Sequence, residues 1–294
     1  MLGKLVKYEW KGTYKVCGLI LACVAAFTVL GCLSLKMPAL DAALKAVENG
    51  GSTGTSFGVL DGMAVLTLVL YVLALVGASY GILIYLGVHF YKSMYSDEGY
   101  LTHTLPVTAN QLLISKILVG GIWMILVLLA IVASIVALFS AFLGMYLQIT
   151  PVEIFQEFGA AMAELFGEAG EVLRVRVIHL AVILIITCVA GSFCSIAMLF
   201  GSITMGQLFS KYRALMAIVC YIGVYILNTI LGSVVQMPFT VSFMMQQNAP
   251  HQNDVWVLDY YNNIFDVSFL LTLVMGAVLY FAARMILVRK FDLE

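Results

Sequence analysis

Six long apolar stretches constrain this chain more than any other feature of its sequence. A helix needs about 20 residues to cross the hydrocarbon core of a bilayer. A single segment that crosses must be helical, because only a helix satisfies its own backbone groups there. The stretches lie at residues 16–35, 63–88, 112–146, 178–200, 214–235 and 267–288. The sequence therefore predicts an all-α polytopic membrane protein, a single domain over residues 1–294 with six transmembrane helices.

The composition agrees with this prediction. Apolar residues make up 63% of the chain and charged residues only 11%, whereas soluble domains carry about 25% charged residues. All five prolines, Pro238 among them, fall outside the predicted spans or at their edges. We therefore expect intact helices across the membrane.

Lysine and arginine are distributed unevenly between the two ends of the predicted spans. Eleven lie on the side that holds the N-terminus and four on the other. The positive-inside rule places the richer side in the cytoplasm. We therefore expect a multi-pass protein of a bacterial plasma membrane with both termini cytoplasmic.

Residues 1–15 form a predicted amphipathic helix. Its four lysines, from Lys4 to Lys15, share an arc of about 80° on a helical wheel, and Trp10 lies on the opposite, apolar half. Glu9 intrudes on that apolar half. Such a helix is typical of a membrane interface, with lysines toward the headgroups. A contact with a partner protein is compatible with this position.

Groups that could power or catalyse a reaction are missing from the sequence. The predicted spans hold no acidic or basic residue away from their ends, which argues against a transporter driven by an ion gradient. No phosphate-binding GxxxxGK[ST], HExxH or GxSxG motif is present, and none of the six cysteines forms a CxxC pair. We therefore expect no catalytic, cofactor or metal site, and no enzymatic activity, on this chain.

The polar segment between the second and third spans, His89 to Lys116, reads HFYKSMYSDEGYLTHTLPVTANQLLISK. Ser96 is a suitable cap for a short helix over 96–105, whose first turn places acids against the positive helix end. Leu105-Pro106 ends that helix, and Thr108 with Gln111 forms a capping box for the next one. This order favours a docking surface over a passive loop, with Tyr95, Tyr100 and Leu101 in the contact patch.

The other loops and spans leave alternatives open. Thr150 and Glu153 form a capping box for an external amphipathic helix over 150–176. Its glutamates are either solvated or attract cationic cargo. The loop 236–266 has room for short re-entrant helices. In the second span, Gly77 and Gly81 permit close helix approach, within the chain or between two copies.

A polar stripe runs along the fifth span. Tyr225, Asn228 and Gln236 recur at helical spacing on one face, and Thr187, Gly191, Ser195 and Ser202 do so on the fourth span. Such stripes are typical of helix packing. The alternative is the wall of a translocation path, for which Tyr225, Asn228 and Gln236 are the candidate residues.

Two segments resemble permeases of the ABC-2 type. SDEGYLTHTLPVTANQLLISK, Ser96 to Lys116, is similar to the Gram-positive branch, in which an acidic-Gly-Tyr-Leu run precedes Leu-Pro and a lysine-ended helix start. MGQLFSKYR, Met205 to Arg213, is a second match, and the amphipathic start and six spans fit the same layout. The resemblance implies a membrane subunit that pairs with a second copy or a sister permease.

The resemblance also implies a partner that supplies energy. A separate ATP-binding cassette subunit, with ATP and magnesium bound to it, would dock on the helix at 96–105 and drive export of a peptide, lipid, drug or envelope component. The expected coupling residues are Asp97, Glu98, Tyr100 and Leu101, with Gln207, Lys211 and Arg213 as a second contact. No nucleic-acid partner is expected. The alternative function is a membrane sensor or scaffold that docks a cytoplasmic partner without transport.

Overall fold

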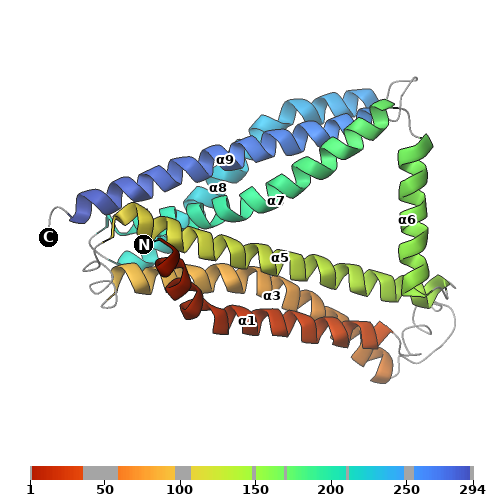
Figure 1. The fold of residues 1–294 in the computed structure, drawn as a ribbon, viewed down its shortest axis with the longest axis horizontal. Coiled ribbons are helices and arrows are strands. Elements are labelled where there is room, and N and C mark those ends of the chain that lie inside the picture. The colour runs from red at the N-terminus through yellow and green to blue at the C-terminus, as the bar shows by residue number, and fades with distance from the viewer. Residues whose placement is uncertain are drawn as a thin grey trace. The chain divides into compact units, whose positions relative to one another are not determined.

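The computed structural model describes residues 2–35, 59–96, 107–147, 150–168, 171–209, 212–247 and 255–291. All regular structure within these ranges is α-helical. Figure 1 shows the helices α1 (Leu2–Leu35), α3 (Val59–Tyr95), α5 (Ala109–Leu147), α6 (Pro151–Glu168), α7 (Glu171–Gly206), α8 (Arg213–Gln247) and α9 (Val255–Phe291). Six of them, all but α6, are long and apolar enough to cross a membrane. The predicted all-helical chain with six candidate spans is therefore confirmed.

The chain divides into two compact units. The first unit comprises residues 1–13, 83–125 and 166–294, and the second comprises 14–82 and 126–165. The long helices α1, α3 and α5 each contribute one part to each unit. The N-terminal part of α1, the end of α3 and the start of α5 thus belong to the same unit as α7, α8 and α9.

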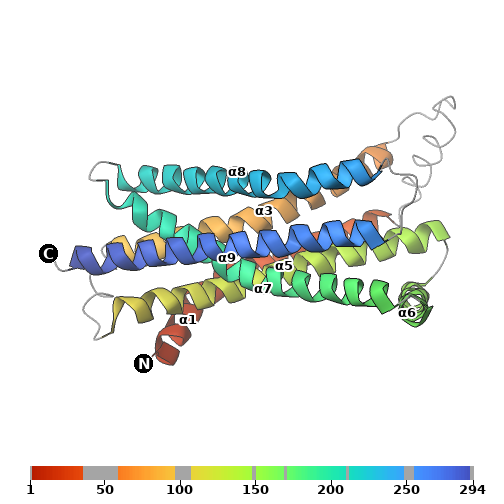
Figure 2. The ribbon, with the colours of Figure 1, turned by 90° about the horizontal axis from the view of Figure 1, so that it is seen from above.

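In the first unit, α7, α8 and α9 pack against one another (Figure 2). Gly201 of α7 lies so close to α9 that an added Cβ would be 2.9 Å from the carbonyl oxygen of Leu279. At the other end of these helices, Arg176 pairs with Asp259 at 3.0 Å. The side-chain amide of Gln236 on α8 donates to Ser268 on α9 at 2.8 Å. Small residues and a few polar pairs hold the three helices together, as is usual where lipid removes the hydrophobic drive for helix association.

In the second unit, a hydroxyl cluster ties three helices together. Ser134 of α5 is buried and lies 2.7 Å from the Thr28 hydroxyl of α1 and 2.8 Å from the Tyr71 hydroxyl of α3. Gly31 lets α1 approach the ring of Tyr71 and the side chain of Leu138. Each hydroxyl therefore has a partner within the unit, which matters because an unpaired polar group in an apolar medium is costly.

Much of the apolar surface of the helices is open. Large apolar side chains are exposed along α3, α7, α8 and α9, and α8 is the least buried of the six candidate spans. Apolar patches of this extent are rare on monomeric soluble proteins. They are the surface expected of helices that contact lipid tails or other spanning helices.

Several helix boundaries differ from the prediction. The predicted division between an interfacial helix at 1–15 and a span at 16–35 is not marked by a break, because α1 is continuous from Leu2 to Leu35. The helix predicted at 150–176 is two elements: α6 ends at Glu168, and residues from Glu171 onward belong to α7. Gly167 lies in the last turn of α6, and glycine weakens a helix; residues 169 and 170 lie outside the described residues.

The region expected as a loop at 236–266 is largely helical. Helix α8 continues to Gln247 and α9 begins at Val255, so the described parts of this region belong to long helices and not to short re-entrant ones. Pro238 lies inside α8 rather than at a span edge. Proline removes one backbone donor from a helix, but helices in apolar surroundings tolerate this loss. Hydropathy detects only the apolar portion of a helix, so polar extensions beyond that portion are missed.

The glycines of the GxxxG pair have open surroundings. Apart from the chain neighbours and the nearby backbone of α3 itself, no atom of a described residue lies within 4 Å of a Cβ built on Gly77 or Gly81. The structure therefore gives no support for the alternative that this pair packs within the chain.

Gly206 of α7 lies against the backbone of α8, so we expect its replacement by a larger residue to be destabilising. An added Cβ there would lie 2.4 Å from the Cα of Ala217 and 2.5 Å from its nitrogen, so backbone would have to move. Gly206→Ala is expected to lower the free energy of unfolding by about 1–3 kcal/mol, the usual cost of overpacking. Titration of the purified protein with a denaturing detergent measures this value.

Gly191→Ala is the matched control, because it lies on the same helix with no atom within 4 Å of the added Cβ. Equal stability of the two variants would contradict the close approach of α7 and α8 at Gly206.

Candidate functional site

The predicted docking surface lies between the end of α3 and the start of α5. Asp97, Glu98, Tyr100 and Leu101 fall in residues 97–106, outside the described residues. The two helix ends that hold this segment are described, because α3 ends at Tyr95 and α5 begins at Ala109. We call these two helix ends, residues 86–95 and 109–120, the loop root.

Helix α5 starts where the sequence predicts. The backbone N–H of Gln111 donates to the hydroxyl of Thr108 at 3.4 Å, and the N–H of Leu112 donates to the Thr108 carbonyl at 3.2 Å. Two donors at the start of the helix are thereby satisfied, which is the role of an N-cap threonine. The second half of the loop root is therefore fixed by its own sequence.

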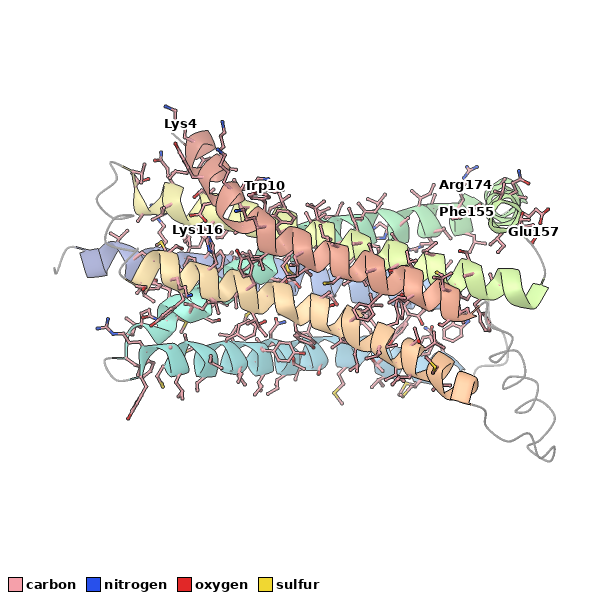
Figure 3. The ribbon with its side chains drawn as sticks, turned by 90° about the horizontal axis from the view of Figure 1, so that it is seen from below. Lys4, Trp10, Lys116, Phe155, Glu157 and Arg174 are labelled. Atoms are coloured by element: carbon pink, nitrogen blue, oxygen red, sulfur yellow. The ribbon has the colours of Figure 1, made fainter. Side chains whose placement is uncertain are left out.

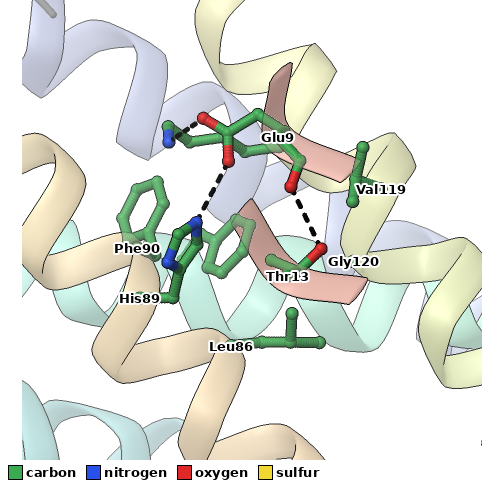
Figure 4. A pocket seen from close by; sticks show the side chains of 9 residues that line it. Glu9, Thr13, Leu86, His89, Phe90, Val119 and Gly120 are labelled. Atoms are coloured by element: carbon green, nitrogen blue, oxygen red, sulfur yellow. Dashed lines mark hydrogen bonds and ion pairs between the residues drawn. The ribbon is translucent and has the colours of Figure 1, made fainter. Parts of the chain in front are cut away.

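A single carboxylate from α1 connects both halves of the loop root (Figure 4). The ammonium group of Lys116 on α5 donates to one carboxylate oxygen of Glu9. The other oxygen lies 3.3 Å from Nε2 of His89 on α3. Glu9 thus bridges the end of α3 and the start of α5 from a third helix. We call Glu9, His89, Ser93 and Lys116 the Glu9 cluster.

The charges of the Glu9 cluster are largely removed from solvent. The Lys116 side chain is 3% exposed and that of Glu9 is 17% exposed. Lys116 also donates to the hydroxyl of Ser93 at 2.8 Å, which links α5 directly to α3. A buried ammonium group is costly unless it is paired and hydrogen-bonded. Here a carboxylate and a hydroxyl both meet that requirement.

Aromatic side chains support Glu9 from the side. The rings of Trp10 and Trp123 stack with their centroids 4.5 Å apart. The indole N–H of Trp123 donates to the Thr13 hydroxyl at 3.0 Å, and that hydroxyl donates to the backbone carbonyl of Glu9 at 3.0 Å. Figure 3 shows Trp10 on the N-terminal part of α1, whose free end carries Lys4. These contacts fix the turn of α1 that carries Glu9.

Two further polar contacts connect the loop root to α7 and α9. Tyr95, which the sequence placed in the docking patch, is instead half-buried at the end of α3, and its hydroxyl donates to Thr204 of α7 at 3.0 Å. The hydroxyl of Tyr280 on α9 donates to the side-chain oxygen of Asn110, near the start of α5. The loop root is thus tied by side chains to α1, α7 and α9.

A small cavity of about 10 Å³ adjoins Glu9, His89 and Lys116 (Figure 4). Small-molecule sites usually measure about 300–1,000 Å³. The cavity is therefore far too small for a substrate, and the charges beside it are held by one another.

The residues of the second predicted contact differ in their exposure to solvent. Gln207 is only 3% exposed, and its side-chain amide donates to the carbonyl of Ile203 at 3.4 Å. Arg213 is exposed at the start of α8, and Lys211 lies outside the described residues. Beside Arg213, Tyr212 is exposed and has a φ of 59°, a conformation uncommon for residues other than glycine. Arg213 is thus accessible to a partner, whereas Gln207 is part of the packing.

The three candidate path residues do not form one site. Tyr225 is 61% exposed on the open side of α8. Gln236 pairs with Ser268 of α9. The side-chain oxygen of Asn228 is buried and has no hydrogen-bond partner among the described residues. The polar stripe is thus split between an open face and a helix contact.

The chain was also compared with known proteins. No family model, curated protein or solved structure matches it.

The polar side chains of the Glu9 cluster contact one another across three helices. Within the described ranges, no group of three or more histidine, cysteine, aspartate or glutamate side chains could hold a metal ion. Glu9, His89 and Lys116 contact one another around a cavity too small for a ligand. The sequence does not indicate that these three residues lie together. It shows Glu9 as an acid on an apolar helix face, and His89 and Lys116 as the two ends of the polar segment.

Proposed function

We propose that this protein is the membrane subunit of a bacterial ABC exporter, driven by ATP hydrolysis in a separate cassette subunit. The six candidate spans and the resemblance of residues 96–116 and 205–213 to ABC-2 permeases support this proposal. In the proposed orientation both termini and the loop root face the cytoplasm, where more of the lysines and arginines lie.

The observation that carries the proposal is the anchoring of the loop root. A segment that receives force from a soluble partner must transmit that force to the spans. This transmission requires helix ends that are held rigidly by contacts with other helices. Glu9 joins α3 to α5, while Tyr95 and Asn110 attach the same two helix ends to α7 and α9. A force applied to residues 96–108 would therefore reach α1, α7 and α9 through these side chains, and α8 through its packing on α7 and α9.

The pairing of two permeases is part of the proposal. The exposed apolar surfaces of the spans leave room for a second copy or a sister permease. The cargo would be a peptide, lipid, drug or envelope component. We do not assign the external helix α6 a role in choosing it.

Purification in mild detergent from the native membrane, followed by mass spectrometry of the co-purifying proteins, tests the proposal. We expect a cassette ATPase with a phosphate-binding loop in about stoichiometric amount. A well-folded chain that retains no such ATPase, or that retains a different soluble partner, would instead favour the sensor or scaffold function.

A further inference from the structure

The Glu9 carboxylate connects α1 with both α3 and α5. One oxygen contacts Lys116 of α5 and the other faces His89 of α3, while the residue itself belongs to α1. The hydroxyl of Tyr85 on α3 also donates to the carbonyl of Gly12 at 3.3 Å. The N-terminal part of α1 is therefore docked side-on against the loop root.

The opposite face of this part of α1 is cationic. Lys4, Lys7 and Lys11 are all exposed. On a helical wheel that starts with Leu2 at 0°, these lysines lie at about 140–200° and Glu9 lies near 340°. Exposed lysines of a helix at a membrane surface are attracted to anionic lipid headgroups. One face of the segment is thus suited to the membrane surface, and the other holds the loop root through Glu9.

The contacts of Lys116 show whether Glu9 joins α3 to α5 or joins α1 to both of them. Lys116 also donates to Ser93, so α3 and α5 stay linked to each other without Glu9. Glu9 is the group through which α1 joins that link. Loss of the Glu9 charge should therefore loosen α1 from the loop root more than it loosens α3 from α5.

We propose that Glu9 is a positioning residue that couples the N-terminal part of α1 to the loop root, and so sets the geometry in which the root transmits movement. This inference rests on the proposed function, in which the segment between α3 and α5 receives the ATPase. The N-terminal part of α1 then moves with the docking segment, and its lysines keep it at the membrane surface.

The first test measures amide hydrogen exchange of the purified wild-type protein and of Glu9→Gln. We expect exchange in residues 3–12 to rise at least about fivefold, the lower range of coupling between sites, with a smaller rise in residues 113–120. Exchange in residues 65–80 of the second unit should stay unchanged. Equal exchange in the two proteins, or a uniform rise over all helices, would overturn the proposed role.

The second test measures ATP hydrolysis by the co-purified complex. We expect Glu9→Gln to retain the ATPase in normal amount, while the effect of the permease on its hydrolysis rate falls at least about fivefold. Glu9→Lys should be worse, and Glu9→Lys combined with Lys116→Glu should recover part of the effect, because the ion pair is restored with its charges exchanged. Glu157→Gln on α6, an exposed position, is the control.

The outcomes separate this inference from the proposed function. A wild-type protein that retains no ATPase would reject the proposed function, and the exchange measurement would then decide the positioning role alone. A retained ATPase whose hydrolysis is the same with wild type and Glu9→Gln would overturn the coupling role of Glu9 and leave the proposed function standing. No gain from the charge exchange over Glu9→Lys alone would also count against it.

Discussion

Lys116→Met is expected to lower the free energy of unfolding by about 3 kcal/mol, near the lower end of the cost of breaking a buried ion pair. Methionine fills much of the space of the lysine stem but removes the ammonium group, which leaves the Glu9 carboxylate without its strongest partner. We place the value at the lower end because 17% of the Glu9 side chain remains exposed. Unfolding with a denaturing detergent, followed by circular dichroism, measures it.

Two variants serve as controls for this result. Asp259→Asn breaks the Arg176–Asp259 pair, whose side chains are 46% and 39% exposed, and should cost no more than about 1 kcal/mol. Glu9→Gln combined with Lys116→Met leaves no unpaired charge and should regain part of the loss. If Lys116→Met costs no more than Asp259→Asn, the Glu9 cluster is not the buried, tightly paired group described above.

The variant Asp97→Ala/Glu98→Ala/Leu101→Ala is expected to lower the amount of co-purifying ATPase at least about tenfold. A few central residues usually carry most of the binding energy of an interface, and a tenfold loss corresponds to about 1.4 kcal/mol. The three residues lie outside the Glu9 cluster, so the stability of the membrane helices should change little. Quantitative mass spectrometry of the purified complex measures the retained ATPase.

Arg213→Ala is the comparison for the second predicted contact, and we expect a loss of only a few-fold from this single exposed residue. An unchanged amount of ATPase on the triple variant, with its helical content intact, would show that the docking surface lies elsewhere on the chain.

Features set by local pattern could be predicted from the sequence. The six spans follow from apolar length alone, and each corresponds to a candidate span in the structure. The capping box at the start of α6 is confirmed in both directions: the N–H of Thr150 donates to the Glu153 carboxylate at 2.8 Å, and the N–H of Glu153 donates to the Thr150 hydroxyl at 3.3 Å. The two residues are only three positions apart, so a short sequence motif contains both partners of each hydrogen bond.

The Glu9 cluster could not be predicted in the same way. Glu9 and Lys116 are separated by 107 positions and Glu9 and His89 by 80, and no local pattern relates residues so far apart. The available signal was an anomaly: an acid on the apolar face of an otherwise amphipathic helix. A charge in such a position requires a partner. A basic residue near the end of another apolar helix, such as Lys116, is the type of partner to seek.

Helix ends and exposure also depended on tertiary structure. The sequence groups Gln207 and Arg213 in one predicted contact, but Gln207 is buried and Arg213 is exposed. Tyr225 and Asn228 are three positions apart on α8, yet Tyr225 is exposed and the Asn228 side-chain oxygen is buried. Helical spacing places residues on a common face but does not say which neighbour covers that face.

The most direct test of the central claim is site-specific photo-crosslinking in native membranes, with the reactive residue placed at position 100 in one variant and at position 155 in another. Tyr100 belongs to the proposed docking segment, and Phe155 is an exposed residue of α6 on the opposite side of the predicted topology. We expect position 100 to capture a cassette ATPase and position 155 not to capture it. Capture of the ATPase from position 155, or of another protein from position 100, would contradict the proposed docking and orientation.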